Sequence, residues 1–549
     1  MTPSELSPEA RGWLHFIWEK STTPDDWSSA GTPHPWWDQT STAPMCAFPR
    51  FDLSETSYLL PVLADQTPAW REVYIRIADE LVGRHTTFWA AIDWLTLIGH
   101  DPRPGDYPPE WLAYLPPHLQ GRYDPPGWTA NGVEPWGLQP DPIGSDGNLF
   151  FRGFFNLLLS IYRYVSGDEK WEAPFRVAGY RDETFEWTHY RIAEFLNHQW
   201  KDRPQGPHCE NTKIWPFCLS AAGLGLQLYD RVSGNRFHGV YEDWVEYAKR
   251  HYLRLDAKGG IASFPFYYDP LEEVVCTFPG EVTGLAALAI TPYVVPQQPE
   301  FGEFLYREGT RLLGWDDPQK AVTPLADPRF LLVGLLMARE LGDDVTEKRL
   351  RDTIDRISEP RHFGDDASQF GYYFGTGEPY PRGQLSALLM LCEVGEPGSW
   401  TRVFNRPDHA LRFQEPTLEG VDFPTLGISR AWNDRERDEL HIHTYAGSPS
   451  RKGADTSFRV TGLRSGDPIT VRHNEADYPH WRRVEETAIE VDLTVGEQRF
   501  CIHSRREAAD RRGMGPSRTR SEAAVVTDGA QSEPRRYQPA SAKCSAGCC

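Results

Sequence analysis

Two cysteines, Cys209 and Cys218, are the residues whose type and spacing could do chemistry. They are nine residues apart, Cys209 in a polar approach and Cys218 at the apolar start of a predicted helix that continues to Gly234. A helix N-terminus stabilises nearby negative charge and can lower a thiol pKa, whereas apolar surroundings raise it. Two thiols of unequal acidity could donate and accept a proton across one pocket. Alternatively, both are small core residues, because free cysteine is among the most buried residue types.

A second pair, Asp52 and Tyr58, lies six residues apart at the start of an apolar segment that ends near Asp65. Six is not a same-face spacing on a helix, so the pattern places Asp52 in a loop and Tyr58 on the helix wall. Asp52 could equally be only a helix cap. Further candidates for a substrate site lie beside the cysteines or on a preceding helix: Phe150, Phe154, Trp215, Phe217, His208 and Glu210. For the four rings, ordinary core packing is the alternative.

The segments that must position these residues repeat one signature. Tyr162-Arg163-Tyr164-Val165-Ser166-Gly167 and Tyr229-Asp230-Arg231-Val232-Ser233-Gly234 both end an apolar stretch, and Leu341-Gly342 is a weaker echo. Each Gly stands where a helix C-cap needs a left-handed residue. Apolar helices that alternate with amphipathic ones are typical of stacked helical hairpins. About a dozen helices are expected before Val394. The predicted fold is therefore mainly α, an (α/α)6 toroid with a small C-terminal antiparallel β-domain.

Changes in composition and hydrophobic periodicity along the chain predict four parts. These are an irregular N-terminal arm (1–47), the (α/α)6 catalytic domain (48–412), a β-rich domain (413–506) and a disordered tail (507–549). Short alternating runs predict the strands: 440–445, 457–460, 469–472, 488–493 and 498–502. His441 and His443 fall on one face of the first of these strands. Without a third ligand, surface pairing is favoured over metal binding.

Composition limits the partners and the location. The formal net charge of −21 argues against nucleic acid, because binding to phosphates needs clustered Lys and Arg. A run of eighteen apolar residues does not occur, so no membrane span is predicted. Nine cysteines, odd in number and scattered, fit free thiols better than a disulfide framework. We expect a cytoplasmic protein, with homo-oligomer formation left open.

With these motifs placed, the sequence resembles the linalool dehydratase/isomerase family. The resemblance is carried by Cys209-Glu210 and a second cysteine at the family's interval, Cys218, by the helix that ends at Tyr229-Asp230-Arg231-Val232-Ser233-Gly234, and by Asp52 and Tyr58. It covers approximately residues 48–396. The resemblance implies an (α/α)6 barrel that interconverts geraniol and linalool and dehydrates linalool to myrcene, without a metal or an organic cofactor.

The sequence departs from the family at one catalytic position. The family has a His in an Asn-x-x-x-x-Gly-His segment, and the matching segment here, which begins at Asn148, has Phe154 at that place. Either His208 replaces the lost proton carrier, or the chemistry differs from reversible alcohol dehydration. A Phe at this position should make the cavity drier and a carbocation longer-lived, which favours isomerisation or ring closure over hydration.

The resulting hypothesis is a terpenoid dehydratase/isomerase that ionises an allylic or tertiary prenyl alcohol. Asp52, held protonated by desolvation, or a thiol would deliver the proton, and Tyr58 would orient the hydroxyl. Cys209 and Cys218 would face the reacting carbons, and the rings would stabilise the cation. Cyclisation of an isoprenoid by the same acid and rings is the alternative. A polysaccharide lyase or glycosidase would instead need convergent residues such as His189 and Tyr190, which point apart on a helix.

Overall fold

A computed structural model describes most of the chain. The described residues are 3–37, 49–91, 140–179, 183–209, 213–270, 273–277, 280–325, 327–364, 366–375, 379–406 and 409–504. They belong to one compact unit that extends from Met1 to Arg505. The predicted tail, residues 507–549, lies outside the described residues. The predicted domain boundaries stay predictions.

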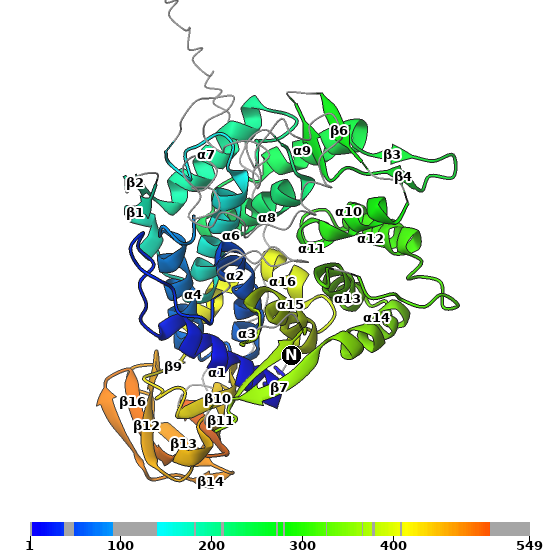
Figure 1. The fold of residues 1–549 in the computed structure, drawn as a ribbon. Coiled ribbons are helices and arrows are strands. Elements are labelled where there is room, and N and C mark those ends of the chain that lie inside the picture. Colours follow the sequence, from blue (N-terminus) through cyan, green and yellow to red (C-terminus); the bar gives the residue numbers. More distant parts are fainter. Residues whose placement is uncertain are drawn as a thin grey trace, which may run out of the picture. The chain divides into compact units, whose positions relative to one another are not determined.

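Helices dominate the first four fifths of the described chain (Figure 1). They are α1 (Pro8–Thr22), α2 (Pro49–Thr56), α3 (Leu59–Gln66), α4 (Glu72–His85), α6 (Leu149–Ser166), α7 (His189–Asp202), α8 (Pro216–Ser233), α9 (Gly239–His251), α10 (Glu281–Ala289), α11 (Thr291–Val294), α12 (Pro299–Leu313), α13 (Arg329–Leu341), α14 (Asp344–Ile357), α15 (Gly383–Val394) and α16 (Ser399–Asn405). The prediction of a mainly helical chain is confirmed.

Alternation of buried and amphipathic helices is also observed. Helices α6 and α8 are buried along almost their whole length, whereas α7 and α9 bury one face and expose the other. The glycines that follow α6, α8 and α13 are left-handed C-caps, as predicted, with φ of 71° at Gly167, 79° at Gly234 and 72° at Gly342. A left-handed residue ends the helix and satisfies its last carbonyl groups, so each apolar helix stops at a defined point.

The close packing of α6 against α8 depends on small residues. A Cβ atom at Gly153 of α6 would lie 2.8 Å from the Cβ of Ala222 of α8, and one at Gly225 would lie 3.0 Å from the backbone N of Leu157. The two helix backbones approach each other closely at both places because no side chain stands between them. This approach brings the first turns of α6 and α8 together, and both turns carry candidate site residues.

The segment before Pro49 is not irregular throughout, which corrects the predicted arm. Residues 8–22 form α1, which begins at the N-cap Ser7 and buries Trp13, Phe16 and Lys20. The prediction of an irregular arm rested on the many Ser, Thr, Pro, Asp and Trp residues before Pro49, which are typical of loops. The packing of α1 against strand β8 (Gln369–Tyr373) supplies the apolar surface that stabilises the helix: a Cβ at Gly12 would lie 2.6 Å from the Cβ of Phe370.

Short β-hairpins lie between helices of this part of the chain. They are β1 (Phe175–Ala178) with β2 (Thr184–Trp187), β3 (Arg254–Leu255) with β4 (Ile261–Ser263), β5 (Tyr267–Asp269) with β6 (Val274–Cys276), and β7 (Glu359–Phe363) with β8. All four pairs are antiparallel.

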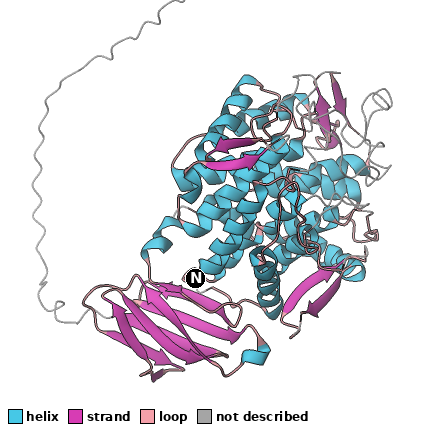
Figure 2. Cartoon of the chain, turned by 60° about the vertical axis from the view of Figure 1, so that its left-hand side comes forward, coloured by secondary structure: helices cyan, strands magenta, loops and turns pink. Residues whose placement is uncertain are grey.

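The C-terminal strands form two antiparallel sheets (Figure 2). The strands are β9 (Thr417–Glu419), β10 (Leu426–Asp434), β11 (Glu439–Ala446), β12 (Asp455–Thr461), β13 (Ile469–His473), β14 (Ala476–Asp477), β15 (Trp481–Glu485), β16 (Ala488–Thr494) and β17 (Gln498–Ser504). Their order is β10-β11-β17-β13-β14 in one sheet and β15-β16-β12-β9 in the other. The five predicted strands correspond to β11, β12, β13, β16 and β17. The rings of Phe458 and Phe500 meet at 5.8 Å, so one apolar face of each sheet packs on the other.

Backbone hydrogen bonds join this β-rich part to the helices. Leu418 of β9 donates its N–H to the carbonyl of Ala69, and the carboxylate of Glu72 accepts the N–H groups of Gly420 and Val421 at 2.8 and 2.9 Å. At the N-terminus, Leu6 donates to the carbonyl of Ser429 in β10. None of the helices in the described ranges has the length and apolar character that a membrane crossing needs.

Replacement of Gly153 by Ala should destabilise the protein, because the added methyl group would overlap Ala222. Overpacking of this kind costs about 1–3 kcal/mol of unfolding free energy. Gly83, inside α4, is the matched control, because a Cβ added there would have no neighbouring atom within 4 Å. Gly83→Ala should be neutral or stabilising by about 0.5–1 kcal/mol, since Ala is the better helix former. Urea unfolding of the two variants would measure the difference, and equal free energies would contradict the close α6–α8 contact.

Candidate active site

The two predicted cysteines are neighbours. Their Sγ atoms lie 3.3 Å apart, within hydrogen-bonding distance, and both residues are free thiols with 0% and 3% of their surface exposed. Cys209 lies in an irregular segment, and Cys218 lies in the first turn of α8, which begins at Pro216. The structure therefore brings together two nucleophilic sulfur atoms from the two ends of one short loop.

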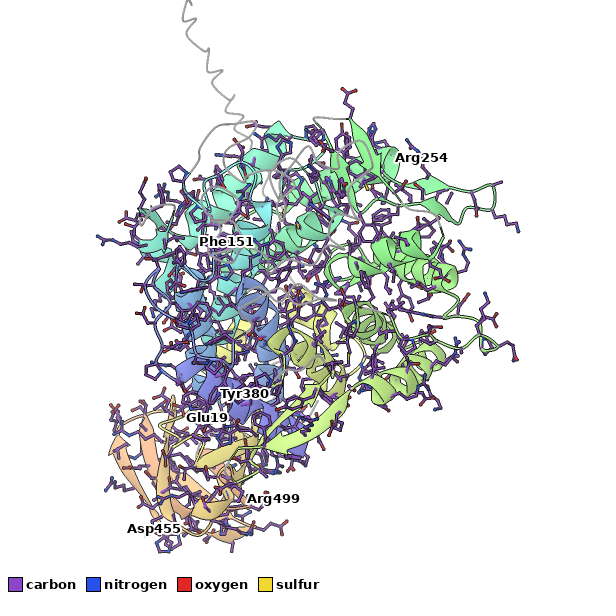
Figure 3. All side chains as sticks on the ribbon, in the orientation of Figure 1. Glu19, Phe151, Arg254, Tyr380, Asp455 and Arg499 are labelled. Atoms are coloured by element: carbon purple, nitrogen blue, oxygen red, sulfur yellow. The ribbon has the colours of Figure 1, made fainter. Side chains whose placement is uncertain are left out.

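Two helix N-termini converge on this thiol pair. Phe150, in the first turn of α6, donates its backbone N–H to the Sγ of Cys209 at 3.2 Å. The neighbouring Phe151, labelled in Figure 3, belongs to the same turn. Because the N-terminal ends of helices carry a partial positive charge, negative charge that develops on either sulfur during proton transfer is stabilised there. This arrangement suits a pair of groups that exchange or accept protons.

A buried ion pair fixes the loop that joins the cysteines. The Nζ of Lys213 lies 3.3 Å from an Oδ of Asp269, and both side chains are fully buried. The carbonyl of Lys213 accepts the N–H of Cys209 at 2.6 Å, and Ile214 exchanges two backbone hydrogen bonds with Tyr268 of β5. The sequence reading missed Lys213 and Asp269, because a Lys in a polar loop gives no sign of burial. Together they position the backbone of Cys209.

Aromatic rings form a continuous cluster beside the thiols. Phe150 and Phe154 stack at 4.3 Å with an angle of 19° between their planes, and Phe217 lies 5.7 Å from Phe154. Tyr293 of α11 joins the cluster, with its ring 6.0 Å from Phe154 and 5.3 Å from Phe217. Three of the four predicted rings are therefore in contact. Phe217 is partly exposed, whereas Phe150 and Phe154 are buried.

Trp215 differs from the other predicted rings because it packs on Tyr267 of β5 at 4.9 Å. Arg50 covers part of the ring of Phe150, with its guanidinium carbon 3.9 Å from the ring centre. That cation–π contact occupies a face of Phe150, so Phe154, Phe217 and Tyr293 are the better candidates to face a bound cation. The position where the family has a His, Phe154, is fully buried within this cluster.

Tyr58 reaches the ring cluster through a second phenol. It is the residue before α3, its hydroxyl lies 3.4 Å from the hydroxyl of Tyr293, and it packs on Trp400 at 5.5 Å. Burial raises the pKa of both phenols well above the ordinary value, with a further rise from the charge of Glu55. Both hydroxyls therefore stay protonated and can donate hydrogen bonds to a substrate oxygen.

Asp52 lies within α2, so the prediction of a loop position is wrong. Helices α2 and α3 are separated by a turn at Ser57 and Tyr58, and this break changes the direction in which the two predicted residues point. The carboxylate of Asp52 is fully buried and accepts from the Nζ of Lys20 at 2.6 Å and from the hydroxyl of Thr56 at 2.9 Å. Gly383 makes room for it, because a Cβ there would lie 1.7 Å from Oδ1.

The Lys20–Asp52 contact changes the expected role of Asp52. Both carboxyl oxygens of Asp52 already accept hydrogen bonds from Lys20 and Thr56, so the geometry does not support Asp52 as the acid for a substrate that the sequence suggested. The sequence reading could not find this partner, because Lys20 lies 32 residues away in α1. Asp52 is better suited to position its surroundings by holding α1 and α2 together.

Glu55, one turn after Asp52, is a titratable residue that the sequence reading missed. Only 4% of its surface is exposed, and Oε2 lies buried with no hydrogen-bond partner. Burial raises the pKa of its carboxyl to about 7, although the positive charge of Arg329 and a hydrogen bond with Gln384 act in the opposite direction. Its charge also acts on Tyr58 and Tyr293, and Cys218 acts on Tyr293 as well. The i, i+3 spacing from Asp52 to Glu55 was the signal that could have indicated it.

The remaining predicted residues are placed as follows. His208 is buried at 8% exposure, and burial lowers its pKa to about 4, so the imidazole is neutral near pH 7 and does not carry the proton that an acid would supply. Its carbonyl accepts the N–H of Leu149 at 3.1 Å. Glu210 lies outside the described residues.

Comparison with known proteins shows that the segment containing Cys209 and Cys218 matches a known family. The family model of the linalool dehydratase/isomerase family matches residues 129–367. The resemblance read from the cysteine motifs is thereby confirmed for this part of the chain, in a divergent form that has Phe at position 154. The match is narrower than the predicted 48–396. It includes Cys209, Cys218 and the ring cluster around Phe154, whereas Asp52, Glu55 and Tyr58 precede it.

Solved structures show only distant likeness. Endoglucanase CelQ from Clostridium thermocellum, complexed with cellotriose, is 12% identical, with 92% of this chain and 93% of that chain covered and a TM-score of 0.32. The GH127 beta-L-arabinofuranosidase Ara127N-Se from Geobacillus stearothermophilus T6 is 8% identical, with 90% and 75% covered and a TM-score of 0.20. Likenesses at these TM-scores carry no conclusion about activity.

Asp52→Asn should lower the free energy of unfolding by about 3–5 kcal/mol, because it leaves the ammonium of Lys20 buried and uncompensated. The double variant Asp52→Leu with Lys20→Met removes both charges and should recover much of this loss. Urea unfolding at pH 7 measures all three chains. A single variant as stable as the wild type would show that the two groups do not form an ion pair.

The raised pKa of Glu55 predicts a pH dependence of stability. A carboxyl that binds its proton more tightly in the folded than in the unfolded protein makes stability fall as pH rises from about 4.5, the ordinary value, to about 7. Glu55→Gln should remove this fall, so its stability relative to the wild type should be greater at pH 8 than at pH 4.5, by on the order of 3 kcal/mol. Unfolding free energies at the two pH values measure it. Glu303→Gln, an exposed site on α12, should keep the wild-type slope.

Proposed function

We propose that this chain is a cofactor-free terpenoid dehydratase/isomerase that ionises an allylic or tertiary prenyl alcohol. The observation that carries the proposal is the pair of sulfur atoms 3.3 Å apart beside a cluster of aromatic rings, in the segment that matches the linalool dehydratase/isomerase family. The substrate class follows from this apolar, aromatic cluster, which suits a small hydrophobic isoprenoid rather than a charged metabolite.

Glu55 is the proposed proton donor, in place of Asp52. A carboxyl group with a pKa of about 7 is partly protonated at neutral pH. This suits a general acid that gives up its proton in one step and, as a base, takes a proton back in a later step. The hydroxyls of Tyr58 and Tyr293 would hold the substrate hydroxyl. The proton from Glu55 goes to that hydroxyl, the C–O bond breaks with its electron pair going to oxygen, and water leaves.

The allylic cation that remains would be stabilised by the ring faces of Phe154, Phe217 and Tyr293. A cation over such a ring gains about 0.5–2 kcal/mol for each contact. One sulfur of the thiol pair would take a proton from the carbon next to the cation while its own S–H proton passes to the Glu55 carboxylate, and the C–H electrons form the new double bond. This relay leaves a thiol and a protonated Glu55, which is the starting state. Re-addition of water at the other allylic carbon gives isomerisation instead.

A terpenoid or meroterpenoid cyclase is the second candidate, favoured by Phe154. A phenyl ring in place of an imidazole removes a proton acceptor from the cation's surroundings, and the ring stacks on Phe150 within the cluster. A longer-lived cation has time to be attacked by a remote double bond of the same substrate. The acid and the lining would be the same, so only the product distinguishes the two activities.

The glycosidase or lyase alternative is less well supported by the residues that prompted it. His189 is 1% exposed and Tyr190 is 40% exposed, so the two rings do not face a common ligand. A glycosidase would also need two carboxylates that converge on a sugar, and the sequence offers Glu183 and Glu186 near the start of α7, both of which are exposed. Our proposal of a terpenoid dehydratase/isomerase includes three further expectations. They are the six helical hairpins of an (α/α)6 barrel, a cytoplasmic location and the formation of a homo-oligomer. The alternation of buried α6 and α8 with amphipathic α7 and α9 supports the first of these.

Incubation with geraniol or linalool, followed by headspace gas chromatography, tests the activity. The wild type should interconvert the two alcohols, release an alkene or form a cyclic product. Cys218→Ser should reduce turnover by at least about 10²-fold, because loss of a positioned acid or base typically costs that much. Cys392→Ser is the matched control, since Cys392 is an equally buried thiol in α15 whose pKa burial raises to about 12.

Circular dichroism should show the same helical signal in both variants, which separates loss of chemistry from loss of fold. Full turnover in Cys218→Ser, or absence of every product from the wild type with both alcohols, would contradict the proposal. A cyclic product without alkene or alcohol interconversion would select the cyclase.

A further inference from the structure

Four side chains that can bind a metal share one face of the C-terminal five-stranded sheet. Strands β11 and β17 are antiparallel neighbours in which His441 pairs with Cys501 and Glu439 pairs with His503. Residues two apart on a strand point to the same side, so the four form two adjacent rows on one face. Arg499, labelled in Figure 3, lies on β17 two residues before Cys501 and pairs with His443 at the next row.

The ligating atoms of three of these residues are already close together, and the fourth lies beside one of them. A carboxylate oxygen of Glu439, a ring nitrogen of His441 and the Sγ of Cys501 all lie within 4.8 Å of one another. The two oxygens of Glu439 reach both imidazoles, at 3.2 Å from Nε2 of His441 and 3.7 Å from Nδ1 of His503. Within the described residues, this is the one place where three such groups converge.

A neighbouring indole holds the ring of His441 in place, and the side chains of the cluster are accessible to solvent. The indole of Trp432 on β10 stacks on His441, with ring centres 4.4 Å apart and planes at 11°. The side chains of Glu439, His441 and His503 are 25%, 23% and 28% exposed. An ion could therefore enter from solvent without opening the sheet, and it would meet at least one imidazole whose orientation is fixed.

We propose that Glu439, His441, Cys501 and His503 form a zinc site that joins β11 to β17. Two imidazole nitrogens, one thiolate and one carboxylate oxygen make a four-ligand set of the borderline-soft kind that Zn²⁺ prefers. Bonds of about 2.0–2.3 Å place tetrahedral ligands roughly 3.3–3.8 Å apart. The separations of up to 4.8 Å among Glu439, His441 and Cys501 therefore need to shrink by about 1 Å, and the imidazole of His503, now 3.7 Å from Glu439, needs to turn toward the other two ligands. Rotation of the side chains about χ1 and χ2 is enough for such a change.

The chemistry of binding is a simple exchange. The thiol of Cys501 loses its proton to solvent as the Zn–S bond forms, and the two imidazoles bind in their neutral form. The contacts of the Glu439 carboxylate with the two imidazoles are replaced by coordination to the metal. The site is remote in sequence from Cys209 and Cys218 and takes no part in the proposed reaction. Its role would be structural, because it ties the last strand of the sheet to its neighbour.

This site would give His441 a different role from the surface pairing that the sequence favoured for His441 and His443. The alternating histidines lacked a third ligand in the sequence, since Cys501 is 60 residues further along. His443 is not a ligand, because its Nδ1 contacts Glu5 near the start of the chain. The register of β11 with β17 therefore selects one of the two histidines as the metal ligand.

Titration of the metal-free, full-length protein with Co²⁺, a spectroscopic substitute for Zn²⁺, tests the site. The wild type should show a thiolate-to-cobalt charge-transfer band and the visible bands of a four-coordinate ion, saturating at one equivalent. Cys501→Ser should lose the charge-transfer band. Cys501→Ser and His441→Ala should each weaken Zn²⁺ binding by more than the ~10–100-fold that loss of a supporting partner costs. Added Zn²⁺ should raise the thermal unfolding midpoint of the wild type but not of these variants.

Two controls separate this site from other thiols. His443→Ala, on the same strand face, should bind Co²⁺ like the wild type. Replacement of Cys544, Cys548 and Cys549 by Ser in the full chain should also leave the spectrum unchanged. A charge-transfer band that persists in Cys501→Ser, or one that disappears in the tail variant, would overturn the proposal, as would absence of the band from the wild type. His503→Gln provides a second test if Cys501→Ser fails to fold.

Discussion

The close approach of α6 and α8 is the constraint on which the candidate site depends. Because Gly153 and Gly225 present no side chain, the two helices pack backbone to backbone, and their first turns come together. One turn contributes the N–H of Phe150 and the other contributes Cys218, so Cys209 is held between them. A larger residue at either glycine would separate the helix that donates the hydrogen bond from the helix that carries the second thiol. The arrangement of the candidate site therefore depends on two positions that have no side chain.

Buried charge determines how the neighbouring segments attach to this pair of helices. Lys20 with Asp52 joins α1 to α2, and Lys213 with Asp269 joins the cysteine loop to β5. Each pair costs desolvation but leaves a larger penalty if one partner is lost, so both act as specific anchors. Glu55 has no such partner for Oε2, and its carboxyl takes up a proton near neutral pH instead. In one helix, Asp52 holds a neighbouring helix through an ion pair, whereas Glu55 keeps one carboxyl oxygen without a hydrogen-bond partner.

In the C-terminal sheets, too, the grouping of candidate ligands depends on which segments pack together. Alternation along β11 and β17 was visible in the sequence and predicted strands, but it could not say which strand pairs with which, or in which register. The register aligns His441 with Cys501 and Glu439 with His503, which groups ligands from two distant segments. A shift of one residue would move Cys501 to the opposite face, since side chains alternate along a strand. Tertiary pairing is therefore what makes a metal site conceivable here.

The sequence by itself determined the features that depend on local spacing. These include the mainly helical character, the left-handed glycine caps, five of the C-terminal strands, and the resemblance to the linalool dehydratase/isomerase family through Cys209 and Cys218. Only the tertiary structure decided the 3.3 Å contact between the two sulfurs, the pairing of Asp52 with Lys20, the raised pKa of Glu55 and the helical nature of residues 8–22. Periodicity reports which face of a helix is apolar. It does not report burial of a charged side chain or its partner, because both depend on segments that are remote in the chain and are brought together by packing.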